Sequence, residues 1–467
     1  MPIIIPANTL ASGGFEVDNS CRFDGTSAYL HKTPTNAGNR LKYTFSTWVK
    51  KSKITGEQII FTAYPNNTNH TYLRFKSTGE IRYRDVASDS TNGDLVTSAK
   101  FRDPSAWYHV VLVVDEENGT SGNRLILYVN GLRVTEFGTE TMPTAATTWN
   151  SADVKMEIGV TDGGDGDDYF SGYMAETVFI DGSALTPTDF GEFDEDSGIW
   201  KPINVSGLTF GTNGFYLDFE ASGNLGNDAS GGTDFTEVNL AATDQTTDTC
   251  TNNFATMLPL TKSTDATLSE GNLNVTYGTA STRRAIFGSI VVTAGKWFCE
   301  TKIIATSQTS VEMNLGISNT YDPEAIGNAL ISTNGFTVSL FPSNGSLYIG
   351  STRDEQGLGN LAVNDIIGMA INIDDGTLQF YKNGSALGSA NDITTGDSDD
   401  GELYPGFTIA NSCSSGGQTF TASHNFGSPA YSESGGNSDA SGFGNFSMSV
   451  PSGFFSICTK NLAEYGG

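Results

Sequence analysis

The chain has 467 residues, with 25 Lys and Arg against 53 Asp and Glu, which gives a formal net charge of −28. Such a chain, which has no basic block, would repel the phosphates of nucleic acids and the anionic headgroups of membranes. No apolar run approaches the ~20 residues of a membrane-spanning helix. We expect no signal peptide either, because no basic segment precedes the short apolar start. With 37% hydrophobic residues, the chain can still bury real cores.

Nearly the whole chain shows the pattern of short strands, in which apolar and polar residues alternate between clusters of Gly, Asn, Asp and Ser. The predicted strands of the first half are 43–50, 58–63, 71–75, 80–85, 109–115, 124–129, 154–160 and 172–181. Those of the second half are 296–305, 310–318, 335–341, 346–350, 365–373, 377–382 and 404–410. One short helix is expected at 185–190, where Thr186 can cap and Pro187 suits the first helical position. This pattern predicts antiparallel sandwiches or jelly rolls.

The two halves share a repeated sequence pattern. In each, an apolar strand ends at an Asp, turns, and is followed by a strand that ends in Asn-Gly, at Asn130-Gly131 and at Asn383-Gly384. Asn-Gly supplies the positive φ angles of a tight hairpin turn. The repetition predicts two sandwiches of related design.

The first half resembles the laminin-G/pentraxin type of concanavalin A-like domain. The residues that carry this resemblance are 22–30, 45–50, 107–110, 127–131 and 170–180. The second half resembles a SPRY domain, which is another concanavalin A-like sandwich. The residues that carry it are 295–300, 314–317, 365–368, 380–384, 403–405, 425–427 and 451–458.

These resemblances imply an all-β fold with two antiparallel concanavalin A-like jelly-roll sandwiches in tandem. The expected parts are an N-terminal arm (1–17), a laminin-G-like sandwich (18–199), a Gly/Asn-rich connector (200–262), a SPRY-like sandwich (263–459, with an insertion at about 428–447) and a C-terminal tail (460–467). We expect the connector to be ordered by docking on its neighbours.

The order of the parts also resembles structural proteins of marine tailed bacteriophages, cyanophages included. Those proteins carry, between the two domain types, segments like 213–219 (NGFYLDF) and 252–260 (NNFATMLPL). The family's usual Pro after Asp-Thr is Cys250 here. The resemblance implies a structural protein on the virion surface, either a tail fibre or adhesion subunit or a head decoration or fibre protein. Its partners would be other virion proteins, copies of itself in a homo-oligomer such as a trimer, and host surface glycan. The apolar segment 1–6 would pack on its own domain or, as we favour, dock on a neighbouring subunit.

An acidic loop at 162–168 is the candidate metal site, with Asp162, Asp165, Asp167 and Asp168 as possible ligands. Calcium takes six to eight oxygens, and closely spaced Asp residues on a Gly-rich loop can supply several of them. A solvated acidic turn is the equally weighted alternative.

Aromatic residues in polar loops are the candidate glycan-binding residues, because sugars stack on exposed rings. They are Tyr64, Trp149, Tyr169 and Tyr321. Trp48, Trp107 and Trp297 lie inside strand patterns and are expected in cores.

Catalysis is not expected. The string Glu192-Phe193-Asp194-Glu195-Asp196-Ser197 only partly matches the three alternating carboxylates of glycan-cleaving concanavalin A-like enzymes, and four scattered His residues offer little acid–base chemistry. The five Cys residues form no metal or redox motif, and we expect no obligate disulfide. We therefore expect a binding protein. The alternatives are a polysaccharide depolymerase on this fold and a lectin-like adhesin of a bacterial surface.

Overall fold

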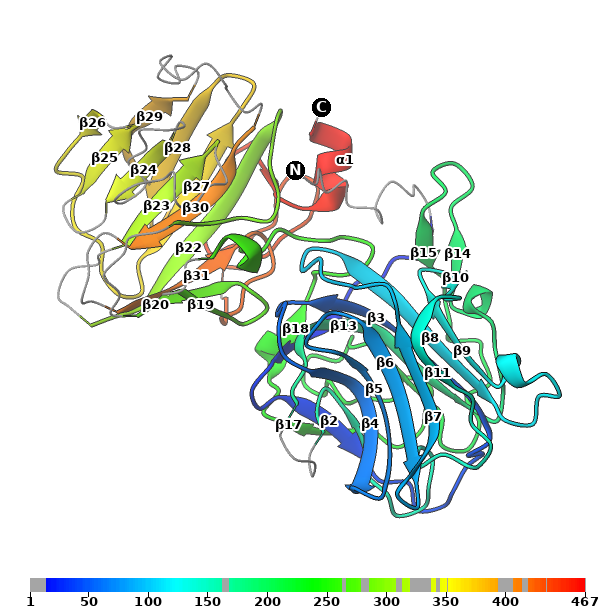
Figure 1. The fold of residues 1–467 in the computed structure, drawn as a ribbon. Coiled ribbons are helices and arrows are strands. Elements are labelled where there is room, and N and C mark those ends of the chain that lie inside the picture. Colours follow the sequence, from blue (N-terminus) through cyan, green and yellow to red (C-terminus); the bar gives the residue numbers. More distant parts are fainter. Residues whose placement is uncertain are drawn as a thin grey trace. The chain divides into compact units, whose positions relative to one another are not determined.

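The computed structural model describes residues 14–161, 168–262, 266–278, 285–307, 313–319, 337–341, 345–350, 352–393, 406–413, 419–433 and 435–466. The chain divides into two compact units, and the division falls between Asn253 and Phe254. Strands dominate both units (Figure 1). The all-β expectation is therefore confirmed.

The first unit is a sandwich of two large sheets. Sheet A runs in the order β10 (Leu132–Arg133), β9 (Leu125–Val129), β8 (Trp107–Asp115), β3 (Lys42–Lys51), β13 (Ser171–Asp181), β1 (Ser20–Asp24) and β18 (Gln245–Thr246), and β16 (Phe215–Leu217) also pairs with β13. Sheet B runs in the order β11 (Phe137–Thr141), β7 (Ser90–Thr97), β6 (Ile81–Ala87), β5 (Asn69–Phe75), β4 (Gln58–Asn66), β12 (Met156–Ile158), β2 (Tyr29–Lys32) and β17 (Thr236–Val238). A separate hairpin joins β14 (Gly191–Phe193) to β15 (Trp200–Pro202).

The second unit also has two large sheets. Sheet C runs in the order β19 (Ala266–Ser269), β20 (Asn274–Tyr277), β31 (Phe420–Asn425), β22 (Lys296–Thr306), β27 (Ile366–Asn372), β28 (Thr377–Lys382) and β29 (Ser385–Asp392), and β32 (Phe455–Ser456) also pairs with β22. Sheet D runs in the order β21 (Ala285–Phe287), β30 (Thr408–Cys413), β23 (Met313–Ser318), β24 (Thr337–Phe341), β25 (Ser346–Ile349) and β26 (Thr352–Glu355). The side chains between these sheets form one apolar core around Trp297, which has no exposed surface.

The two hairpins of the repeated pattern, which end at Asn130-Gly131 and Asn383-Gly384, have the same local structure. β8 pairs with β9, and β27 pairs with β28, both antiparallel. Asn130 and Asn383 have φ angles of 49° and 50°. Each Asn follows the second strand of its pair, and its side chain accepts a 2.8 Å hydrogen bond from the backbone N–H of a residue in the first strand, His109 of β8 or Ile366 of β27. The Asn-Gly signal therefore set the turn conformation in both units.

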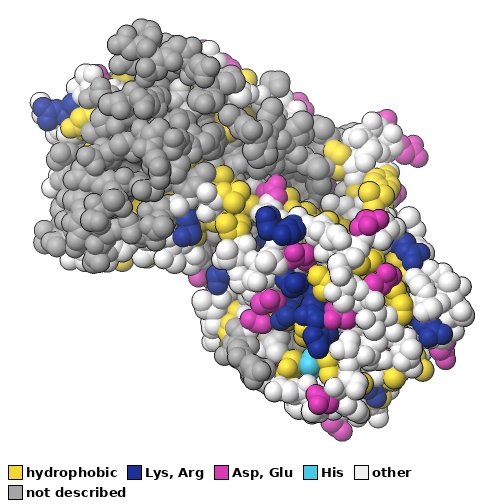
Figure 2. All heavy atoms as spheres, in the orientation of Figure 1, with side chains coloured by type: hydrophobic (Ala, Val, Ile, Leu, Met, Phe, Trp, Pro, Cys, Tyr) yellow, Lys and Arg dark blue, Asp and Glu magenta, His cyan; other side chains and the backbone are white. Residues whose placement is uncertain are grey.

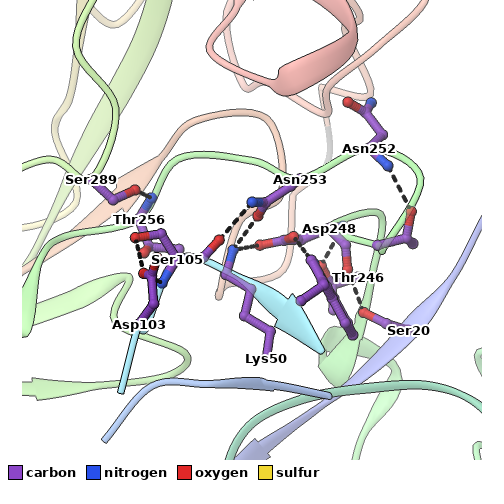
Figure 3. Close-up of polar contacts among 12 residues, drawn as sticks. Ser20, Lys50, Asp103, Ser105, Thr246, Asp248, Asn252, Asn253, Thr256 and Ser289 are labelled. Carbon is purple, nitrogen blue, oxygen red and sulfur yellow. Dashed lines mark hydrogen bonds and ion pairs between the residues drawn. The ribbon is translucent and has the colours of Figure 1, made fainter. Parts of the chain in front are cut away.

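The connector completes the first sandwich. Its strands β16, β17 and β18 pair with β13, β2 and β1, so they extend both sheets. Beneath it, the buried Lys50 ammonium donates to Asp248 Oδ2 at 2.7 Å and to Asn253 Oδ1 at 2.6 Å (Figure 3). Asp248 also accepts from Trp107 Nε1 at 3.2 Å, and Asn253 donates to the Ser105 carbonyl at 2.7 Å. A buried ion pair with these additional bonds fastens the connector to sheet A.

The outer face of sheet A is covered. One patch on it packs Trp48, Trp107 and Tyr173 against Val17, Trp200 and Cys250, and a second packs Val111, Val113, Val178 and Ile180 against Phe190, Val205 and Tyr216. Trp200 Nε1 donates to His109 Nδ1 at 2.9 Å, and Ser46 Oγ contacts His109 Nε2 at 2.8 Å. Burial lowers the pKa of His109 to about 3, so this histidine is a neutral core residue.

Short helical turns and a C-terminal helix complete the two units. They are η1 (Ser121–Asn123), η2 (Pro187–Asp189), η3 (Ala242–Asp244), η4 (Pro259–Thr261) and α1 (Thr459–Tyr465). The expected helix start at 185–190 is a single 3-10 turn, in which the Thr186 N–H donates to Asp189 Oδ2 at 2.8 Å. The expected C-terminal tail is helical from Thr459 to Tyr465, and the buried Asp439 accepts hydrogen bonds of 2.7–2.8 Å from Ser456 before the helix and from Asn461 within it.

Candidate functional site

The outer face of sheet B carries polar and charged side chains, of which Arg74, Arg82 and Arg84 are partly exposed. Along β5, Leu73 and Phe75 point into the core, so His70, Tyr72 and Arg74 point outward, because successive side chains alternate between faces. On β6, Ile81 and Tyr83 likewise point inward, and this directs Arg82 and Arg84 outward. We call the set Tyr64, His70, Tyr72, Arg74, Arg82 and Arg84 the arginine face.

Figure 2 shows Lys and Arg side chains grouped on the visible face of the first unit, with acidic side chains around them and one His beside them. Figure 1 draws β4 to β7 on the same side. The chain as a whole has a net charge of −28, so three outward arginines on two adjacent strands make this face much more basic than the rest of the sequence.

The planar groups of the arginine face form a stack. The Tyr64 and His70 rings lie 4.4 Å apart with an interplanar angle of 14°. His70 is parallel to Tyr72 at 5.7 Å, and the Arg74 guanidinium lies 4.5 Å from the Tyr72 ring centroid. Such aromatic and cation–π contacts favour flat groups packed in layers. Burial, followed by the nearby Arg84 charge, lowers the pKa of His70, so its imidazole is neutral at pH 7.

Two of the arginines are neutralised by carboxylates. Arg82 forms a bidentate pair with Asp94, with Nε–Oδ1 at 2.9 Å and NH2–Oδ2 at 2.6 Å. Arg74 lies 2.8 Å from Glu57 Oε2 and 3.4 Å from Asp168 Oδ2. These pairs offset the repulsion between Arg74 and Arg82, which face each other across β5 and β6.

The structure places the candidate glycan-binding aromatics in different environments. Tyr64 is half-buried at one end of the stack, and its hydroxyl donates to Asn67 Oδ1 at 3.2 Å. Tyr169 is also half-buried, 6.5 Å from Tyr29 between ring centroids. Tyr321 lies outside the described residues.

The prediction for Trp149 is wrong. Its side chain has no exposed surface and packs against Phe61 and Phe45 in the core, while its Nε1 donates to the Thr71 carbonyl at 2.8 Å. A ring sealed between two sheets cannot stack on a sugar. Trp200, which also follows a loop-like segment, is buried as well, with 5% of its surface exposed. The polar residues beside Trp149 and Trp200 in the sequence therefore did not indicate that these side chains are exposed.

For the acidic loop, Asp162, Asp165 and Asp167 lie outside the described residues. Asp168 is described, and its carboxylate pairs with Arg74. Across the described ranges, no group of three or more His, Cys, Asp or Glu side chains could hold a metal ion. The one ligand candidate that can be placed therefore forms an ion pair with an arginine.

The carboxylates of the enzyme-like string do not form a catalytic pair. Glu192 and Asp194 lie at the β14–β15 hairpin, and both contact Lys201, at 3.4 Å and 3.1 Å. Hydrogen bonds from Ser197 hold the pKa of Asp194 at about 2. A glycosidase needs a carboxyl whose pKa is raised so that it can act as an acid. The pKa of the Asp194 carboxyl is lowered instead.

Four cysteines, Cys21, Cys250, Cys299 and Cys458, are free thiols buried in the cores. In the parts of the chain that the structure covers, no helix is long and apolar enough to cross a membrane.

Comparisons with known proteins agree with this architecture. Residues 24–189 match the family model described as the concanavalin A-like lectin/glucanases superfamily (laminin G type), and residues 299–421 match the SPRY domain model. The chain carries two concanavalin A-like domains in tandem. No curated protein matches it.

Solved structures give distant likenesses. The SPRY domain of human HERC1 matches at 15% identity and a TM-score of 0.29, over 36% of this chain and 96% of that one. A SAP-like pentraxin from Limulus polyphemus matches at 23% identity and a TM-score of 0.28, over 36% of this chain and 78% of that one. A putative carbohydrate binding protein from Bacteroides ovatus matches at 15% identity and a TM-score of 0.34, over 49% of this chain and 61% of that one. These scores are too low to carry an argument about function.

Sequence reasoning found the strands of the arginine face and named Tyr64, but it did not single out His70, Tyr72 or the three arginines. The signal was present in the alternation His70-x-Tyr72-x-Arg74 and Arg82-x-Arg84. Alternation alone does not say which strands are neighbours, and only the register brings Tyr72 opposite Arg84.

Proposed function

We propose that this protein is a non-enzymatic, lectin-like binding protein that contacts surface glycan through the arginine face. The observation that carries the proposal is the contrast between the two sheets of the first sandwich. Sheet A is covered on its outer side by apolar packing, whereas the outer side of sheet B carries a stack of planar groups with charged groups beside it. Tyr64 and Arg74 are the partly exposed members of this stack, and His70 and Tyr72, which are 8% and 7% exposed, support them from below. Stacked rings and fixed polar groups are the usual elements of a sugar-binding surface.

We further propose that the protein works on a bacteriophage particle, as a tail fibre or adhesion subunit or as a head decoration or fibre protein. This part rests on the order of the two domain types and on the connector segments 213–219 and 252–260. In this role the protein would bind other virion proteins and copies of itself, and its ligand would be glycan on the host surface.

Binding can be tested on an array of bacterial surface polysaccharides. Tyr64→Ala removes the half-buried end of the stack, and we expect binding about two- to tenfold weaker, since an aromatic contact contributes roughly 0.5–1.5 kcal/mol. Tyr465→Ala is the matched control, because Tyr465 is a partly exposed tyrosine of the second unit. If the wild type bound no polysaccharide, or both variants weakened binding equally, the proposed site would be wrong.

The particle role has its own test. Mass spectrometry of purified virions should find the protein, and its copy number separates a decoration protein (hundreds) from a fibre (tens). Absence from particles would contradict the virion role and leave the glycan-binding proposal standing.

A further inference from the structure

The buried Lys50 side chain brings an amine, an amide and a carboxylate into contact inside the first unit. Its ammonium donates to Asn253 Oδ1 at 2.6 Å and to Asp248 Oδ2 at 2.7 Å, and both acceptors converge on it (Figure 3). All three residues are buried, and the most exposed of them, Asn253, shows 6% of its surface. The fold thus holds an amine against an amide from a position 203 residues away in the sequence.

The distance between the amine and the amide suits a reaction between them. The carbonyl carbon Cγ of Asn253 is one bond of ~1.2 Å from Oδ1, so Lys50 Nζ lies within ~3.8 Å of that carbon. Reacting atoms in a near-attack arrangement are ~3–3.5 Å apart, and a fold that holds them there makes the step intramolecular. Such fixed contact can let an amine attack an amide, a reaction that is negligibly slow between free molecules.

The Asp248 carboxylate is placed to remove a proton from the amine. Its Oδ2 accepts from Lys50 Nζ, while its Oδ1 is fixed by a 3.2 Å bond from Trp107 Nε1. The surroundings are apolar, since Nζ lies 5.3 Å from the centroid of the Tyr173 ring, which packs with Trp48 and Trp107. Transfer of the proton turns two buried ions into two neutral groups, and apolar surroundings penalise neutral groups far less than ions.

We infer that Lys50 and Asn253 form an intramolecular isopeptide bond, with Asp248 as the catalytic residue that moves the protons. The structure describes the state before the reaction, in which Lys50 and Asp248 are an ion pair.

The reaction balances without an oxidant or a cofactor. Asp248 takes a proton from the Lys50 ammonium, and the lone pair freed on Nζ forms the bond to Asn253 Cγ while the carbonyl π electrons move to Oδ1. The bond from Cγ to Nδ2 then breaks with its electron pair on nitrogen, Asp248 returns its proton to that nitrogen, and Oδ1 regains its double bond. Nζ gives up a second proton, so the products are one secondary amide and one ammonium ion.

Two other lysines show that burial alone does not create this arrangement. Lys51 is also buried, but its ammonium lies over the Phe75 ring, 4.5 Å from the centroid. Lys32 contacts the Asp228 carboxylate at 3.3 Å. Within the described part of the chain, neither lysine has a side-chain amide oxygen within hydrogen-bonding distance. The combination of amine, amide and carboxylate is therefore particular to Lys50.

The bond would tie the end of the first unit to the interior of sheet A. Asn253 is the last residue of that unit, and Lys50 lies in β3, which pairs with both β8 and β13. The connector otherwise joins the sheets through β16, β17 and β18, which are only two or three residues long. Tension that reaches residue 253 along the chain would then pass directly into β3. The inference does not depend on glycan binding.

Intact-mass spectrometry of the full chain tests the bond. The folded wild type should weigh less than its sequence requires by one ammonia, and a digest should contain a cross-linked peptide that joins Lys50 to Asn253. Lys50→Arg, Asn253→Ala and Asp248→Asn should each have their full sequence mass. Lys51→Arg and Asn252→Ala are the matched controls, because they change neighbouring buried residues outside the reacting set. Both controls should keep the mass loss.

The wild-type result decides the question even if a variant does not fold. A wild-type chain of full mass without the cross-linked peptide would overturn the inference and leave the ion pair as a structural contact. The cross-linked peptide also separates this bond from ammonia lost elsewhere, and a mass loss that persisted in Asn253→Ala would place the reaction at another residue. A loss that persisted in Asp248→Asn would refute the catalytic role of Asp248. On a denaturing gel, the wild type should keep a closed loop and migrate ahead of Asn253→Ala.

Discussion

The buried pair Lys50–Asp248 gives the sharpest prediction about stability. Both side chains are nearly sealed, with 1% and 2% of their surfaces exposed. Asp248→Asn keeps the size of the side chain and can still accept from Trp107, but it removes the charge that balances the Lys50 ammonium. Removing one partner of a buried pair costs about 3–5 kcal/mol, because the remaining charge is left without compensation. The second acceptor, Asn253, places the expected loss at the lower end, about 3 kcal/mol.

In a unit of this size, each kcal/mol lowers Tm by roughly 2–4 °C. We therefore expect Asp248→Asn to lower the Tm of the first unit by about 6–12 °C in scanning calorimetry. The unfolding transition of the second unit should not move, since Lys50 and Asp248 both belong to the first.

Glu192→Gln is the matched control. It breaks the contact between Lys201 and a Glu192 side chain that is 56% exposed, and surface pairs contribute about 0–1 kcal/mol. A Tm loss below about 2 °C for Asp248→Asn, or an equal loss in the control, would refute the idea that this pair fastens the connector to sheet A.

Three further outcomes are expected. Burial raises the pKa of the Glu176 carboxyl from its ordinary 4.5 to about 8, against the smaller opposing effect of the 2.8 Å bond from the Tyr216 hydroxyl. The folded state then holds a proton that the unfolded chain releases, so stability should fall as pH rises from 4.5 to 8, by at most about 1.4 kcal/mol per pH unit. Glu176→Gln should reduce this slope in urea titrations, and an unchanged slope would contradict the assignment. In a glycan-release assay, wild type and Glu192→Gln should both liberate no sugar, and release that depends on Glu192 or Asp194 would favour a depolymerase. If the loop containing Asp168 binds calcium, added calcium should raise Tm and a chelator should lower it, whereas no shift would end the calcium hypothesis.

Local patterns were enough to predict long strands such as β3, β8, β13 and β22 and the two matching hairpins, but they missed β7, β29 and β31. Alternation and the Asn-Gly turns act within a few residues, so Asn130 and Asn383 could be placed without knowing the rest of the fold. Burial of loop residues could not be predicted in this way. Trp149 stands among polar residues in the sequence, yet its side chain is buried in the core. It is buried because it packs against residues such as Phe61, which lie in strands more than fifty residues away in the sequence. The connector was expected to dock, but its backbone pairing with β1, β2 and β13 depends on sheet edges that sequence does not reveal.

The residues of the arginine face also could not be grouped from the sequence alone. Its residues belong to strands that the sequence predicts, but their meaning depends on the register. A shift of one residue between β5 and β6 would turn Arg84 toward the core and Tyr83 outward. The register also decides which arginine Asp94 neutralises, since Asp94 faces Arg84 but bonds Arg82. A charge count over the whole chain predicts repulsion of anions, but it does not show that Arg74 and Arg82 are already paired with neighbouring carboxylates. At physiological ionic strength charges are screened beyond ~8 Å, so the charge that a ligand meets depends on the few groups within that distance and not on the net charge of the chain.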